Sequence, residues 1–138
     1  MRASISIRSV VSTEDDTDRV EVVTDGEYSY GSGVIHLAYY ESPITGMAGT
    51  RTTFDVYGDY ATMSRVGSVT SYVQFKSGES HHFAYRTPDG MMNMSIETRS
   101  LVNRLGVGGG TLEILYDVGM QGSPLSRNNV IIRVDPVQ

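Results

Sequence analysis

The chain has 138 residues, 39% of them hydrophobic and 20% charged, which is the composition of one ordinary globular domain and excludes a disordered chain. The formal net charge is -5 and no cluster of Lys and Arg reverses it locally, which argues against nucleic acid as a partner. The absence of Cys excludes disulfides and thiolate chemistry and favours the cytoplasm, and no apolar run is long enough to predict a membrane partner.

The N-terminal segment predicts a hairpin and lacks the continuous apolar run of a signal peptide. Apolar and polar residues alternate over residues 3–8, which is the period of a half-buried strand. The alternation slips at Val10 and Val11, which predicts either a bulge or the end of the strand. An acidic segment, residues 14–18, forms the expected tip, and the second strand covers residues 19–30.

The rest of the chain reads as further strands separated by turns rich in Gly, Pro and Asn. The turn Gly31-Ser32-Gly33 leads into a strand over residues 34–40, and residues 42–49 form a loop. The other expected strands cover residues 50–57, 60–65, 68–76, 80–87, 91–99, 111–120 and 128–134. Residues 100–105 are compatible with a single helical turn.

Closely spaced strands with short turns favour an antiparallel meander, and closing the sheet on itself removes its exposed edges. We therefore predict an all-β fold in which residues 1–138 form a single closed antiparallel meander barrel of about eight to ten strands. Ten strands leave an interior that side chains must fill or a ligand must occupy. The function would then depend on that interior.

Four segments carry a resemblance to a known family: LAYYE (residues 37–41), MSRVGSV (63–69), FAYRTPDG (83–90) and GGTLEILYDV (109–118). The C-terminal SRNNVIIRV fits the closing strand of the same family. In this order they resemble the YwiB-like family of uncharacterised bacterial proteins. The resemblance implies a lipocalin-like, or calycin-like, β-barrel, and it implies no activity and no functional residue.

The alternation places Tyr hydroxyls and Met thioethers on the inward face, a lining that suits a small hydrophobic or amphipathic ligand. The predicted ligand-binding residues are Tyr39, Phe54, His81, Tyr85, Met92, Met94, Thr98 and Tyr116. The alternative is that these side chains satisfy one another and fill the barrel. The protein would then be a structural or protein-interaction barrel, with a homodimer as one form of it.

Sites for catalysis or metal binding are not indicated. His81 and His82 are neighbours in a strand and point to opposite faces, with His81 inside, so they cannot hold one metal ion. The acidic tip lacks calcium-loop spacing, and the glycine-rich residues 106–110 lack the Lys of a phosphate loop. No carboxylate pair for acid–base work is identified, because the candidates mostly fall on the polar phase: Glu41, Asp55, Glu97, Glu113 and Asp117. We expect no cofactor and no metal, and a protein that is not an enzyme.

Overall fold

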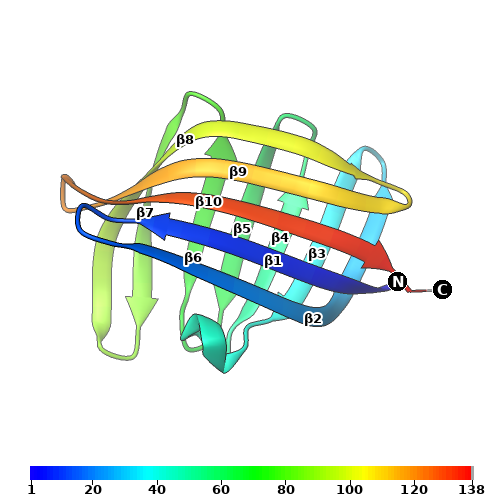
Figure 1. Ribbon diagram of the computed structural model, residues 1–138, viewed down its shortest axis with the longest axis horizontal. Coiled ribbons are helices and arrows are strands. Elements are labelled where there is room, and N and C mark those ends of the chain that lie inside the picture. Colours follow the sequence, from blue (N-terminus) through cyan, green and yellow to red (C-terminus); the bar gives the residue numbers. More distant parts are fainter. Residues whose placement is uncertain (138) are drawn as a thin grey trace.

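The computed structural model describes residues 1–137, which form ten strands and one short 3-10 helix (Figure 1). The elements are β1 (Arg2–Ser12), β2 (Thr17–Gly31), β3 (Val34–Tyr40), η1 (Pro43–Thr45), β4 (Arg51–Val56), β5 (Tyr60–Val66), β6 (Ser71–Lys76), β7 (Ser80–Thr87), β8 (Gly90–Gly106), β9 (Gly109–Met120) and β10 (Ser123–Pro136). The predicted all-β antiparallel fold is confirmed.

The strands form one sheet in the order β6-β5-β4-β3-β2-β1-β10-β9-β8-β7. Neighbours in the chain pair as in a meander, and β1 also pairs with β10, which brings the two ends of the chain together (Figure 1). The sheet closes between β6 and β7, where Thr70, just before β6, forms an isolated bridge with Arg86 of β7. The amide of Gly78 in the β6–β7 turn also donates to the carbonyl of Thr98 in β8 at 2.8 Å. The barrel is therefore nearly closed, with one loosely joined seam.

Two groups of strands cross steeply in Figure 1: β8, β9, β10, β1 and β2 lie in front of β3 to β6. The long strand β2 joins the groups, because it pairs with β1 up to Glu27 and with β3 from Gly26 onward. A Cβ atom at Gly26 would lie 2.4 Å from both the Ala38 carbonyl oxygen and Ile5 Cδ1. Only glycine allows the strands to approach this closely at the corner.

The core fills the space between the two groups of strands. Its largest fully buried side chains include Ile5, Tyr28, Leu37, Val56, Phe75, Leu112, Ile114 and Ile132. Inward positions alternate with more exposed ones along β4 and, apart from the buried Ala38, along β3, as the sequence predicts. The hydroxyl of Tyr28 donates to the Gly106 carbonyl at 2.6 Å and so links β2 to the end of β8.

The expected irregularity at Val10 and Val11 is wrong. Strand β1 keeps an unbroken register with β2 and β10 through Ser12, because Ser9 takes the inward position between Ile7 and Val11. A small polar residue on the inner face therefore looks, in the sequence, like a slip of register.

The helical turn considered for residues 100–105 is also wrong, since this segment belongs to β8. Strand β8 pairs with β9 from Met94 to Gly106, and its irregularity is a register shift between Thr98 and Ser100. Long cross-strand pairing overrides the weak local helical preference. The predicted turn over residues 31–33 is confirmed, with positive φ at Ser32 (55°) and Gly33 (75°).

Candidate ligand cavity

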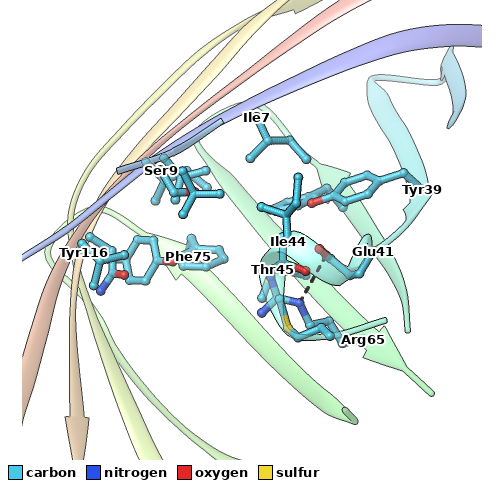
Figure 2. Close-up of a pocket in the computed structure, with 17 residues that line it drawn as sticks. Ile7, Ser9, Tyr39, Glu41, Ile44, Thr45, Arg65, Phe75 and Tyr116 are labelled. Carbon is cyan, nitrogen blue, oxygen red and sulfur yellow. Dashed lines mark ion pairs between the residues drawn. The ribbon is translucent and has the colours of Figure 1, made fainter. Parts of the chain in front are cut away.

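A cavity of about 240 Å³ lies inside the barrel, under the loop of residues 42–49 (Figure 2). Most of its wall is apolar and comes from β1, β2, β4, β5, β6, β9 and β10. The apolar lining residues are Ile7, Val11, Val20, Phe54, Met63, Phe75, Ile114 and Val130. The fully buried residues Ile5, Tyr28 and Leu112 do not line it, so this cavity occupies only part of the barrel interior.

The covering loop is held in place by its own turn and by the β5–β6 connection. Pro43 begins η1, and Gly46 ends it with φ of 76°, which places Ile44, Thr45 and Met47 on the cavity. At the far end of the loop the Ser68 hydroxyl donates to the Ala48 carbonyl at 2.8 Å. The loop is anchored at both ends, and three of its side chains form the cover.

A buried polar array stands at the loop end of the cavity. Glu41 follows β3, and only 3% of its side chain is exposed. The Thr52 hydroxyl donates to the Glu41 carboxylate, and Arg65 Nε donates to Thr52 Oγ1 at 3.3 Å. Arg65 Nε also lies 3.7 Å from Glu41 Oε2, the ion pair drawn in Figure 2. Residues on or next to strands β3, β4 and β5 therefore bring one carboxylate, one guanidinium group and one hydroxyl together inside the barrel.

Two tyrosines share this environment. Burial, and next the charge of Glu41, raise the pKa of Tyr39 well above its usual range. Burial also raises the pKa of Tyr116, whose ring lies 5.0 Å from that of Phe75. Figure 2 shows Arg65 beside Glu41 and near Ile44 and Thr45, with Phe75 and Tyr116 across the open space. Both phenols stay neutral at physiological pH and act as hydrogen-bonding groups.

The structure brings three of the eight predicted residues to this cavity: Tyr39, Phe54 and Tyr116. Thr98 pairs with Tyr116 across β8 and β9 and is buried, but it does not line the cavity. Whether any of the eight binds a ligand stays a prediction.

The other four predicted residues lie on the β7–β8 hairpin, away from the cavity. His81, Tyr85, Met92 and Met94 are each only half-buried. The ring of His81 packs edge-on against Tyr72, a largely exposed residue of β6, at a centroid distance of 6.3 Å. Met94 lines a separate open groove together with His82 and Phe83. The alternation of apolar and polar residues predicts which face of the strand these residues occupy, but it does not predict whether that part of the strand borders the cavity.

Glu41 and Arg65 are the two charged residues that line the cavity, and neither is among the eight ligand-binding residues predicted from the sequence. The expectation that carboxylates fall on the polar phase is wrong for Glu41, which lies two positions after Tyr39 and shares its inward phase. Arg65 pairs with Thr52 across β4 and β5 and therefore shares its face. The signal was present in both cases, and the prior that charged residues face water concealed it.

Within residues 1–137 no group of three or more His, Asp or Glu side chains is arranged to hold a metal ion. The same residues contain no helix that is long and apolar enough to cross a membrane.

Comparisons with known proteins identify the family of this chain. The family model described as "Domain of unknown function (DUF1934)" matches residues 5–132. The chain belongs to this family. The crystal structure of the ywiB protein from Bacillus subtilis has 21% sequence identity, covers 99% of this chain and 92% of its own, and superposes with a TM-score of 0.88. No curated protein matches the chain.

The YwiB-like resemblance is therefore confirmed, and at this identity the solved structure supports the fold alone. Three of the segments that carry the resemblance converge on the cavity. Glu41 lies in LAYYE, Arg65 in MSRVGSV and Tyr116 in GGTLEILYDV. The family name assigns no function, so the cavity is the place to look for one.

Proposed function

We propose that this protein is a non-enzymatic binding protein that holds one small, mostly apolar molecule with a polar group in the cavity under the loop of residues 42–49. The observation that carries the proposal is the Arg65–Glu41 pair inside a mostly apolar cavity. Removing two charges from water costs several kcal/mol, and apolar residues of similar volume often stabilise a core at least as well. Binding a polar group of a ligand accounts for this buried pair, whereas core packing alone does not require it.

The size of the cavity limits the ligand. At about 240 Å³ it exceeds the roughly 150 Å³ of an engineered apolar cavity that binds benzene. It falls below the roughly 300–1,000 Å³ that is typical of drug-sized ligands. A molecule of about ten non-hydrogen atoms is the size we propose.

The proposed setting follows from the whole sequence. The absence of Cys supports the cytoplasm as its compartment, and the net charge of -5 supports a small molecule over nucleic acid as its partner. We propose no catalytic role, because the Thr52 hydroxyl, which is hydrogen-bonded to Glu41 and Arg65, is fully buried and does not line the cavity.

A cavity-filling variant tests the proposal. Ser9 lines the cavity on β1, and Ser6 lies on the opposite phase of the same strand, so Ser9→Phe and Ser6→Phe form a matched pair. Native mass spectrometry of the purified protein and thermal shift with small apolar molecules measure occupancy. We expect wild type and Ser6→Phe to bind and Ser9→Phe not to bind. Empty wild-type protein whose thermal transition stays unmoved by every such molecule would refute the proposal.

The second candidate is an interaction barrel that works through its outer surface as a homodimer. It is favoured by a row of exposed residues on neighbouring strands, in which Tyr40 pairs with Arg51 and Arg51 pairs with Val66. Tyr40 is 65% exposed and Val66 is 66% exposed. Sedimentation of wild type and Val66→Glu tests it. A concentration-dependent dimer that is lost in the variant supports this candidate, and a monomeric wild type removes it.

A further inference from the structure

Arg65 has hydrogen-bonding capacity that the protein leaves unused. A guanidinium group carries five N–H donors, and the one on Nε is directed to Thr52. Neither Nη atom donates a hydrogen bond to any group in residues 1–137, although only 21% of the Arg65 side chain is exposed. The Tyr116 hydroxyl also lines the cavity without a hydrogen bond to another residue of the described chain. The cavity therefore offers several donors to an acceptor group on a ligand.

Glu41 is, in contrast, already engaged. It accepts from Thr52, faces Arg65 at 3.7 Å, and lies near the hydroxyl of Tyr39. Its charge formally cancels that of Arg65, so the array as a whole is neutral. A ligand with a charged group would bring one unbalanced charge into a mostly apolar, partly enclosed cavity, and that costs free energy unless a further partner compensates it.

From this charge balance we infer that the cavity selects ligands whose polar group is an uncharged acceptor, such as the carbonyl of an amide, ester or ketone, over carboxylates and amines. The carbonyl oxygen accepts from the Nη atoms of Arg65, and the apolar part of the ligand contacts Phe54, Phe75 and Ile114. The inference rests on the proposed function and adds the chemical class of the ligand. Arg65 and Glu41 together are its specificity determinants.

Octanamide and octanoate provide the decisive comparison, because their polar groups are nearly isosteric and differ in charge. At pH 7 octanoate is ionised and octylamine is protonated. Isothermal titration of the unmodified protein is expected to give the tightest binding for octanamide, by about tenfold over the other two, which is the low end of the cost of leaving a charged group uncompensated. If octanoate binds as tightly as octanamide, the inference falls and the proposed function stands. If none of the three binds, both fall.

A charge variant sharpens the test. Glu41→Gln leaves Arg65 without its counter-charge, so we expect octanoate to gain about tenfold in affinity and octanamide to change by less than about threefold. Glu79→Gln is the matched control, because Glu79 pairs with Lys76 at 3.7 Å on the surface and loses the same charge. An unchanged octanoate affinity in folded Glu41→Gln would overturn the inference.

If Glu41→Gln does not fold, the double variant Glu41→Gln with Arg65→Met removes both charges and retains comparable volume. Loss of about tenfold in octanamide affinity supports the role of Arg65. An unchanged octanamide affinity in this double variant contradicts it.

Discussion

The wall formed by β3, β4 and β5 and the hairpin formed by β7 and β8 have similar sequence patterns and different environments. Both alternate apolar and polar residues, and both contain Tyr or Met on the inward phase. In the wall, Leu37 is 0% exposed and the inward phase faces the core and the cavity. In the hairpin, Tyr85, Met92 and Met94 remain half-buried beside the seam. An alternating pattern therefore identifies a face of a strand, while the depth of burial depends on what covers that face.

The largest expected difference between the two regions is in the effect of truncating a side chain. Leu37→Ala removes a fully buried side chain and should lower the free energy of unfolding by about 2–5 kcal/mol. Met92→Ala in the hairpin should cost less than about 1 kcal/mol, because its side chain is only partly removed from water. Urea unfolding of both variants measures this. Equal losses would show that the hairpin is as well packed as the wall.

A smaller effect is expected at the corner where β2 enters the wall. Gly26→Ala places a Cβ atom 2.4 Å from the Ala38 carbonyl oxygen, and the overpacking should cost about 1–3 kcal/mol of unfolding free energy. Gly31→Ala, at the end of the same strand, meets nothing within 4 Å and should be neutral within about 0.5 kcal/mol. Thermal unfolding of the pair compares them. A neutral Gly26→Ala would mean that the corner can widen without loss.

The same comparison explains how far the sequence determined the structure. The strands of the wall and their inward residues Ile35, Phe54 and Val56 were predictable, because one side of each strand is buried along its whole length. The continuity of β8 was not, because pairing with β9 extends it through a segment with no clear alternation. The cavity was predictable only in part. Tyr39 and Tyr116 follow from alternation. Glu41 and Arg65 share the inward phase of Tyr39 and Met63, but charged side chains are normally expected to face water.

The smallest expected effect concerns the outer face of β8, β9 and β10, where ion pairs take the place of buried contacts. Asp117 accepts from Arg99 Nε at 2.6 Å and from Arg127 Nε at 2.9 Å. The hydrogen bond from Arg127 contributes most to holding the pKa of Asp117 below its ordinary value of 3.8. Because the unfolded chain binds this proton more readily, the stabilisation is complete above pH 3.8 and is lost as the pH falls through the lower folded pKa.

Asp117→Asn should therefore lower the free energy of unfolding at pH 6 by about 1 kcal/mol, the scale of partly exposed pairs. The difference from wild type should shrink below pH 3.8, since protonation removes the same charge from the wild-type protein. Urea unfolding between pH 2 and pH 7 measures it, with Asp89→Asn as the control, because Asp89 makes no ion pair within residues 1–137. A difference that stays constant with pH would show that Asp117 contributes through its packing and not through its charge. The outer face of β8, β9 and β10 would then be stabilised in the same way as the wall formed by β3, β4 and β5.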